Sequence, residues 1–275
     1  ALVSIITPYY NAGKYFEETF NSVMNQTFPW FEWIIVNDGS TNEEDVKILE
    51  KFAKEDTRIR VINQENGGQS CARNTGVNNA KTDLVVPLDA DDLIAPPYLE
   101  YLYWALQENP DAAWAYTDSY GFGTQEYVWK YPFNAERMKK ENMLVATAMI
   151  RKKDFDDIGG YKIEKWRYNE DWRFWLEMLE QHKKPVHVSG ELFWYRRHDT
   201  GMLTTLNNDE ERNKFSENII KEAAANVDTT VQSIEYPRRK TAYSFYKPKY
   251  TEWERKSNPT QIGKRVMWLI PWMVM

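Results

Sequence analysis

The sequence predicts an α/β protein whose central sheet is mostly parallel and carries helices on both faces. Short apolar segments alternate with segments whose apolar residues recur at helical spacing. Small polar residues cluster around Asn11, Asp38, Gly67 and Asp89, in each case near the end of a predicted strand. Open sheets of this class bind ligands beyond the carboxyl ends of their strands, so these clusters are expected to meet in one crevice.

The first half of the chain alternates strands with helices. Residues 2–6 predict a buried strand, which should end in a loop at 7–11 because Pro8 donates no ladder hydrogen bond. Pro87 lies inside another apolar segment and predicts a bulge or a strand end there. The polar run 37–41 predicts a turn that caps the next helix. The other expected elements are a helix from 14 to 24, a strand at 33–36, a helix through Val46, Leu49 and Phe52, a strand at 60–62, a helix at 70–80 and a strand at 84–88.

The second half continues this pattern to about residue 206. After that point the sequence becomes charged, aromatic and weakly periodic, except for a helical pattern at 209–225 and an apolar end at 265–275 that resembles the first strand of a further domain. The expected elements are helices at 98–107 and 170–181 and strands at 112–116, 145–150, 185–188 and 192–196. We expect a main domain at 1–206, a helical and extended C-terminal appendage with a linker at 207–259, and the start of a second domain at 260–275.

Composition excludes several classes of protein. The 35 Lys and Arg residues against 41 Asp and Glu give a net charge of −6, which argues against a nucleic-acid partner. One cysteine, Cys71, excludes an intrachain disulfide framework and a thiolate zinc site, and a cytoplasmic setting fits best. No apolar run approaches the roughly 20 residues that cross a bilayer. The 12 Trp and 17 Tyr residues fill a core or provide rings that stack on sugars or bases.

Three aspartates follow the apolar strand at 84–88, at positions 89, 91 and 92. Carboxylates this close repel one another unless a cation or a proton relieves them. Mg²⁺ or Mn²⁺ is a suitable partner, because such ions take one or two protein carboxylates and substrate phosphate oxygens for the rest. The alternative is that Asp91 and Asp92 cap the following helix. The run by itself leaves both interpretations open.

Further motifs occur in a fixed order along the chain. They are Thr7-Pro8-Tyr9-Tyr10-Asn11, Val36-Asn37-Asp38-Gly39-Ser40-Thr41, Asn66-Gly67-Gly68, Ala72-Arg73-Asn74-Thr75-Gly76, Leu88-Asp89-Ala90-Asp91-Asp92, Gly159-Gly160-Tyr161, Asn169-Glu170-Asp171-Trp172 and Trp194-Tyr195-Arg196-Arg197-His198. In this order they resemble glycosyltransferase family 2 over about residues 2–205. The resemblance implies the Rossmann-like GT-A fold, a nucleotide-sugar donor that is commonly UDP-linked, a divalent metal ion, and sugar transfer with inversion.

The resemblance implies a nucleotide-binding role for the first motifs. Asp38 is expected to accept a hydrogen bond from the base, inside a pocket wall formed by Thr7, Pro8 and Tyr9. Gly67 would let the backbone approach the nucleotide closely. The alternative is that Asp38 and the glycines are ordinary turn residues.

The resemblance also implies a metal site. Asp91 would be the principal ligand of Mn²⁺ or Mg²⁺, and Asp89 would contact both the ribose and the ion. His198 matches a histidine that some relatives use on the metal or the diphosphate, although an exposed loop histidine is the competing interpretation. Arg73 would reach toward the base or a phosphate, unless it is a surface arginine on its helix.

Asp171 is the candidate general base. Inverting transfer needs one carboxylate to take the proton of the acceptor hydroxyl. Glu170 points about 100° away from Asp171 on a helix, so the base is assigned to Asp171 by resemblance alone. Glu170 and Trp172 are expected near the donor or acceptor sugar. The alternatives are an acidic pair that stabilises a helix N-terminus and a tryptophan that belongs to the core.

The sequence departs from processive members of the family, because it lacks a Gln-x-x-Arg-Trp run and membrane helices. We therefore expect a non-processive enzyme that adds one sugar to a glycan, polysaccharide or lipid-linked acceptor, in the cytoplasm and compatible with the inner face of the membrane. The end of the chain resembles the opening of a GT-B transferase domain. The alternative functions are a non-catalytic carbohydrate- or nucleotide-sugar-binding module and a sugar nucleotidyltransferase on the same layout.

Overall fold

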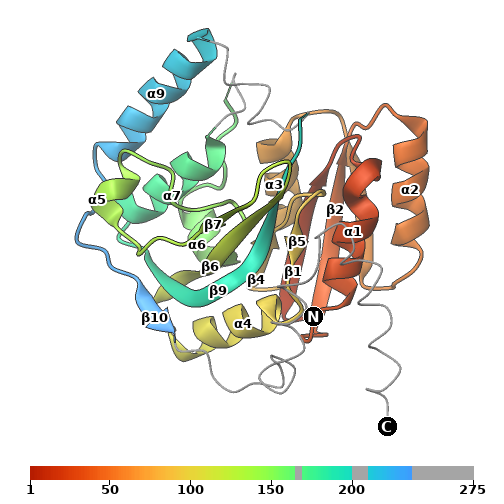
Figure 1. The fold of residues 1–275 in the computed structure, drawn as a ribbon, viewed down its shortest axis with the longest axis horizontal. Helices are drawn as coiled ribbons and strands as arrows, with labels where there is room; N and C mark the ends of the chain where they lie inside the picture. Colours follow the sequence, from red (N-terminus) through yellow and green to blue (C-terminus); the bar gives the residue numbers. More distant parts are fainter. Residues whose placement is uncertain (165–168, 200–209, 237–275) are drawn as a thin grey trace.

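The computed structural model describes residues 1–164, 169–199 and 210–236 (Figure 1). Strands and helices alternate along the first half, as the hydrophobic pattern predicts. The elements of this half are β1 (Val3–Tyr9), α1 (Gly13–Met24), β2 (Phe31–Asp38), α2 (Glu43–Ala53), β3 (Ile59–Gln64), α3 (Gln69–Asn78), β4 (Leu84–Pro87), β5 (Leu93–Ile94) and α4 (Tyr98–Glu108).

The second half adds longer strands and the helices that complete the other side of the molecule. Its elements are β6 (Ala112–Gly123), β7 (Tyr127–Trp129), α5 (Ala135–Met138), β8 (Met149–Arg151), α6 (Lys152–Asp157), α7 (Glu170–Glu180), β9 (Lys184–Arg197), α9 (Glu210–Ala224) and β10 (Ile234–Tyr236). Within the described ranges no helix is long and apolar enough to cross a membrane.

The strands form one mixed sheet in the order β10-β9-β6-β8-β4-β1-β2-β3, with β5 paired to β9 and β7 paired to β6. Parallel pairing joins β4, β1, β2 and β3 at one end and β10, β9 and β6 at the other. Between them β8 is antiparallel to both β4 and β6, so β4 and β6 point the same way. The predicted α/β class with a mostly parallel sheet is confirmed.

Each face of the sheet carries its own core, which follows from the two-residue period of a strand. Ile5 of β1 lies in the core formed with α1, α2 and α4, whereas Ile6 lies in the core formed with α3 and α7. Figure 1 shows α1 and α2 at one side of the molecule and α5, α7 and α9 at the other. Ile220 and Ala224 of α9 belong to the second core.

The two prolines in strands behave differently. β4 ends at Pro87, as predicted. β1 was expected to stop before Pro8, but it continues to Tyr9 and pairs with β2 over its whole length. β4 pairs only with residues 4–6 of β1, so Pro8 has a neighbour on one side only and its missing donor is tolerated there.

Two strand predictions in the second half were wrong. Of residues 145–150, only the last two are in a strand, β8. The strands expected at 185–188 and 192–196 are one strand, β9, with a bulge between them. Across this bulge Thr117 faces Val188 and the next residue, Asp118, faces Glu191. Gly190, at φ +128°, occupies the bulge in a conformation that favours glycine.

The residues beyond 206 are only partly described. Segment 234–236, expected in the appendage, is the edge strand β10 of the same sheet, and α9 packs on α7. The expected linker after residue 236 and the segment 260–275 lie outside the described residues.

An ionic network that is buried at Asp118 and His187 and exposed at Glu235 fastens β10 to the sheet. The imidazole of His187 on β9 contacts Asp118 of β6 through Nε2 at 2.9 Å and Glu235 of β10 through Nδ1 at 2.8 Å. Burial by itself lowers the pKa of His187, but its hydrogen bonds with the two carboxylates outweigh this and raise the pKa above 6.5. The imidazolium form therefore stabilises the fold.

We expect His187→Gln to reduce the free energy of unfolding by about 1.5–3 kcal/mol at pH 6, the range for a hydrogen bond to a charged group. Because the pKa of His187 is raised on folding, its contribution is complete below pH 6.5 and disappears as pH rises through the folded value. The difference between the two proteins in urea denaturation should therefore shrink between pH 6 and pH 9. His182→Gln is the matched control, because the His182 side chain is 75% exposed although it also pairs with a carboxylate. A His187→Gln difference that stays constant or grows with pH contradicts the assignment.

Candidate active site

The site lies at the carboxyl edge of the sheet, where β1 has β2 on one side and β4 on the other. The chain leaves β1 toward β2 and β3 and then returns to the opposite side of β1 as β4. In open α/β sheets, a reversal of this kind is the usual place for a ligand to bind. Asn11 ties the first two loops together, since its Oδ1 accepts hydrogen bonds from the backbone N–H groups of Thr41 and Asn42. Asn42, rather than the run 37–41, supplies the side-chain cap of α2.

Asp38 fastens the loop that precedes α3. Its Oδ1 accepts from the backbone N–H of Gly67 at 2.8 Å and its Oδ2 from that of Gly68 at 2.7 Å. Gln64 donates a third hydrogen bond to Oδ1. Gly68 has φ +87°, so this sharp entry to the helix favours glycine. The carboxylate is buried, and in this structure its role is to shape the turn.

The expected pocket wall on β1 mostly faces inward. Thr7 is fully buried and accepts a hydrogen bond from Trp33 Nε1. Tyr9 is also fully buried, and its hydroxyl donates to the backbone carbonyl of Asp45. Burial and the charge of Asp45 raise the pKa of Tyr9. Of these three residues, only Pro8 exposes part of its surface.

Arg73 links three elements at the centre of the site. Its guanidinium donates to both oxygens of Asp89, after β4, at 2.7 and 3.0 Å. The same group donates to Glu170, at the start of α7, at 2.8 Å. The Arg73 side chain is only 2% exposed, so the interpretation as a surface arginine is wrong. Two carboxylates compensate its buried charge, and the guanidinium also lies over the ring of Tyr161.

The three clustered aspartates have separate roles. Asp89 is partly exposed and holds Arg73, and burial raises its pKa despite that cation. Asp92 is buried and accepts from the backbone N–H of Arg196 at 2.7 Å; burial, followed by the charges of Asp91 and Asp89, raises its pKa. Helix α4 begins only at Tyr98 and has no side-chain cap, so the capping interpretation is wrong. Asp91 remains the most exposed carboxylate of the run.

His198 lies beside Asp91. Its Nε2 is 3.0 Å from Asp91 Oδ2, and its ring contacts that of Tyr15. Arg196, two residues earlier, is buried, with its Nε donating to the backbone carbonyl of Asp91 and its guanidinium reaching Glu18. Arg196 therefore fastens the backbone at Asp91 to Glu18 of α1.

The side chains present fit a divalent ion that takes only part of its coordination shell from the protein. Asp91 and His198 offer one carboxylate oxygen and one ring nitrogen at the same point. Across residues 1–164, 169–199 and 210–236, no group of three His, Cys, Asp or Glu side chains forms a complete metal cage. Ions such as Mg²⁺ and Mn²⁺ commonly take one or two protein ligands and complete their shell with water and substrate phosphate oxygens.

Asp171 and Glu170 diverge at the start of α7. Glu170 accepts hydrogen bonds from Arg73 and from Gln69 of α3. Asp171 turns toward the loop before β8, and its Oδ1 accepts from the side chain of Asn142 at 3.2 Å and from the backbone N–H of Trp172 at 2.8 Å. Burial and the neighbouring charge of Glu170 raise the pKa of Asp171 to about 7. A carboxyl group with this pKa is suited to exchange a proton near neutral pH.

Trp172 packs mainly against the core and does not form an open surface for a sugar. Its Nε1 donates to the backbone carbonyl of Met138 at 2.6 Å, and its ring packs against the core that contains α7. The sequence did not indicate Gln69 or Asn142, which lie in a polar helix start and in a loop and reach α7 across 101 and 29 residues. Contacts between residues so far apart along the chain leave no local pattern in the sequence.

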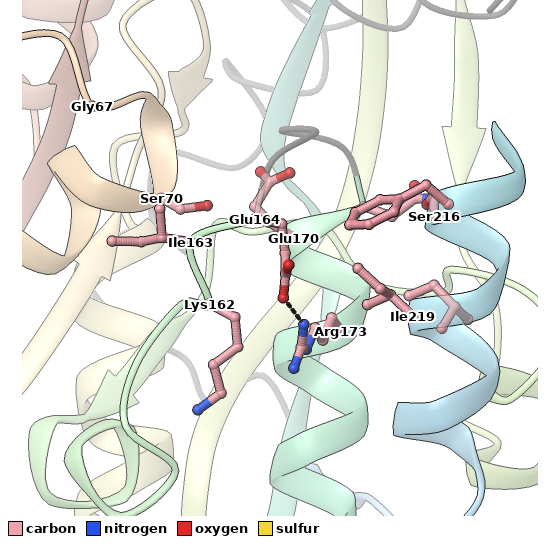
Figure 2. A pocket seen from close by; sticks show the side chains of 12 residues that line it. Gly67, Ser70, Lys162, Ile163, Glu164, Glu170, Arg173, Ser216 and Ile219 are labelled. Carbon is pink, nitrogen blue, oxygen red and sulfur yellow. Dashed lines mark hydrogen bonds and ion pairs between the residues drawn. The ribbon is translucent and has the colours of Figure 1, made fainter. Parts of the chain in front are cut away.

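A hollow of about 440 Å³, open to solvent, lies beside this cluster (Figure 2). It is bounded by the loop before α3, the start of α7 and one side of α9. Gly67 and Glu170 reach it, whereas Asp38, Asp91 and Asp171 do not line it. Arg173, on its α7 wall, pairs with Glu164 and Glu177. The candidate residues thus meet through a chain of contacts rather than around one closed cavity.

The chain is similar to known glycosyltransferases. The profile of the family described as Glycosyl transferase family 2 matches residues 4–198. Glycosyltransferase GlyG of Streptococcus pneumoniae serotype 4 is 38% identical over 109 residues, which are 39% of this chain and 36% of that protein. The putative teichuronic acid biosynthesis glycosyltransferase TuaG of Bacillus subtilis is 33% identical over 189 residues, 66% of this chain and 73% of that protein.

The fold is similar to a solved structure. S. aureus TarS 1-349 in complex with UDP-GlcNAc has a TM-score of 0.69 at 21% identity, covering 83% of this chain and 68% of that one. This similarity confirms the expected GT-A fold. The chain spans well under half the length of some relatives, 36% of GlyG and 18% of the GlyA glycosyltransferase of the same organism.

We expect Asp38→Ala to destabilise the protein by about 1–3 kcal/mol, because it leaves the buried N–H groups of Gly67 and Gly68 without an acceptor. Asp111→Ala, at an exposed position, is the control and should change the free energy of unfolding by less than about 0.5 kcal/mol. Chemical denaturation measures both. Equal stability of the two variants contradicts the role of Asp38 in holding the turn.

Proposed function

Because the chain belongs to glycosyltransferase family 2, we propose that it transfers one sugar from a UDP-linked donor to a hydroxyl group of a glycan acceptor, with inversion at the anomeric carbon. The observation that carries this proposal is the position of Asp171 at the start of α7. Burial and the charge of Glu170 raise the pKa of its carboxyl group to about 7. The neighbouring residue, Glu170, joins Asp89 in binding the guanidinium of Arg73. Polysaccharide synthesis is the proposed context, supported by the similarity to TuaG.

We assign the nucleotide to the loops after β1, β2 and β3. A carboxylate oxygen has two lone pairs, so Asp38 Oδ2 has room to accept from a uracil imide in addition to Gly68. Asp38 is only 3% exposed, so this contact requires the turn at Gly67 to open slightly as the base enters. The complexes of TarS with UDP and UDP-GlcNAc, on the same fold, support UDP as the nucleotide of the donor.

We assign a bound Mn²⁺ or Mg²⁺ to Asp91 and His198, with Asp89 near the ribose and the ion. The ion would supply neutralisation of the negative charge that builds on the departing diphosphate. Arg73 holds Asp89 in a fixed orientation from the other side. Arg196 fixes the backbone at Asp91, so the ligand loop is already positioned before a donor arrives.

Asp171 is the proposed general base. The acceptor hydroxyl oxygen attacks the anomeric carbon, its proton moves to the Asp171 carboxylate, and the bond from carbon to the diphosphate oxygen breaks on the opposite side. The electron pair of that bond leaves with the nucleoside diphosphate. Asn142 and the Trp172 N–H hold Oδ1, which orients the carboxylate for this transfer.

The metal assignment predicts that Asp91→Ala abolishes the stabilisation by UDP that depends on Mn²⁺. A ligand that binds only the folded protein raises its melting temperature, so thermal shift with UDP, with and without Mn²⁺ or EDTA, measures the effect. Asp111→Ala is the control and should respond as the unsubstituted protein does. An undiminished Mn²⁺-dependent shift in Asp91→Ala would exclude Asp91 as the principal ligand.

The base assignment predicts that Asp171→Asn binds UDP normally but lowers the rate of transfer by about 10²–10⁴-fold. Glu180→Gln, at the exposed far end of the same helix, is the matched control. Release of UDP from UDP-sugars measures turnover and also separates an enzyme from a binding module, which releases none. A native rate in Asp171→Asn contradicts the assignment.

The same assignment predicts a pH dependence of kcat/KM in the unsubstituted enzyme. The base must be deprotonated, so kcat/KM should fall as pH drops through about 7, by about tenfold per unit below that value, and level off above it. Initial rates between pH 5 and pH 9 measure this profile. A rate that stays constant down to pH 5 is incompatible with a base of raised pKa.

A further inference from the structure

A second hollow lies between the β6-β7 hairpin and the loop before β8. It is a shallow hollow that is open to solvent. Residues 116–119 of β6 form its floor, and residues 143–145 form one wall. The assignments made so far do not use it.

Two aromatic rings form the opposite wall. Trp129, the last residue of β7, and Tyr131 lie edge to face, with ring centroids 5.6 Å apart and planes at 87°. The indole N–H of Trp129 donates to the backbone carbonyl of Met143 at 2.9 Å, which fixes the ring against the loop. Tyr131 is 43% exposed, and the guanidinium of Arg137 lies over its ring. The hollow therefore offers a rigid apolar surface that remains accessible from solvent.

A buried carboxylate lies at the floor of the hollow. The Asp118 side chain is only 2% exposed, and it is held by His187 and by the backbone N–H of Gly190. The ammonium group of Lys130, on an exposed side chain, approaches Asp118 Oδ2 to 3.6 Å. A fixed carboxylate next to aromatic rings suits a ring that carries hydroxyl groups, because its C–H face contacts the aromatic rings and its O–H groups donate to the carboxylate.

The hollow adjoins the proposed base. Asn142 donates to Asp171 Oδ1, and the next three residues of the chain line the hollow. Because β6 points the same way as β4, the carboxyl half of β6 lies at the same edge of the sheet as Asp89 and Asp91. Arg73 and the donor-side residues approach α7 through Glu170, whereas the hollow approaches it through Asn142.

We propose that this hollow binds one neutral sugar ring of the acceptor. The adjacent sugar unit of the acceptor then carries the hydroxyl group that Asp171 deprotonates. The proposal rests on the proposed glycosyl transfer, and it assigns the glycan acceptor a binding place on the side of Asp171 away from Arg73. Trp129 and Tyr131 supply the stacking surface, and Asp118 accepts from ring hydroxyls.

The test is ¹⁹F NMR of the protein labelled with 5-fluorotryptophan. Trp129→Phe identifies the Trp129 resonance by its loss, and Trp104, exposed on α4, serves as the reference. The probes are the methyl glycosides of glucose, galactose and N-acetylglucosamine at millimolar concentrations. We expect at least one of them to shift the Trp129 resonance in a saturable way and to leave that of Trp104 unchanged. The absence of any Trp129 shift, or an equal shift of Trp104, overturns the proposal.

Variants of Tyr131 test the stacking surface with the glycoside that binds. Tyr131→Ala should weaken its affinity about tenfold, the size expected for one lost aromatic contact, and Tyr131→Phe should retain it within about twofold. Trp104→Ala is the matched control, at an exposed aromatic residue on α4. Unchanged affinity in Tyr131→Ala overturns the proposal. UDP release by the unsubstituted protein is measured separately, so failure of glycosyl transfer and failure of the sugar site give different results.

Discussion

The buried guanidinium of Arg73 is the interaction on which the rest of the site depends. It lies between Asp89, which follows β4, and Glu170, which starts α7, and it is almost inaccessible to solvent. A buried cation is tolerated only where carboxylates compensate it, so neither partner can move away without a large cost. The ion pair with Asp89 thereby fixes the loop that leads to Asp91, and the ion pair with Glu170 fixes the helix turn that carries Asp171. One side chain thus connects the loop after β4 with the start of α7.

The sheet topology explains why these groups meet at all. Loops after β1, β2 and β4 share one edge because the three strands are parallel and adjacent. The carboxyl end of β9 joins the same edge through its parallel pairing with β6, which brings His198 to Asp91. The second core, on the other face, holds α7 and α9 and so places the start of α7 over α3. The sheet therefore sets where the loops lie, and the loops carry most of the candidate side chains.

Local patterns were sufficient for most of the first half of the fold, and they drew attention to acidic residues that the structure places at one edge of the sheet. Alternation between strand and helix spacing located β1 to β4 and α1 to α4 closely but not the short strand β5, and the polar run after β4 pointed to Asp89 and Asp91. The errors arose where long-range pairing overrides local signals: Pro8 stays in a strand because one edge of β1 is unpaired there, and Ser189-Gly190 looks like a turn although it is a bulge in β9. Thr7 and Tyr9 face the core, which no motif reveals. Asn142 and Gln69 became visible only through contacts with α7.

The span of these contacts along the chain has a consequence for the order of assembly. Arg73 meets Glu170 across 97 residues, and the loop at Asp91 and Asp92 meets Arg196 and His198 across 104 to 107. Strands β1 to β4 pair largely with one another, so this portion can collapse early, whereas the catalytic edge waits for β9 to dock. Distant pairings close slowly because chain entropy opposes them. A nascent polypeptide would thus gain its nucleotide-side scaffold well before it becomes competent for chemistry.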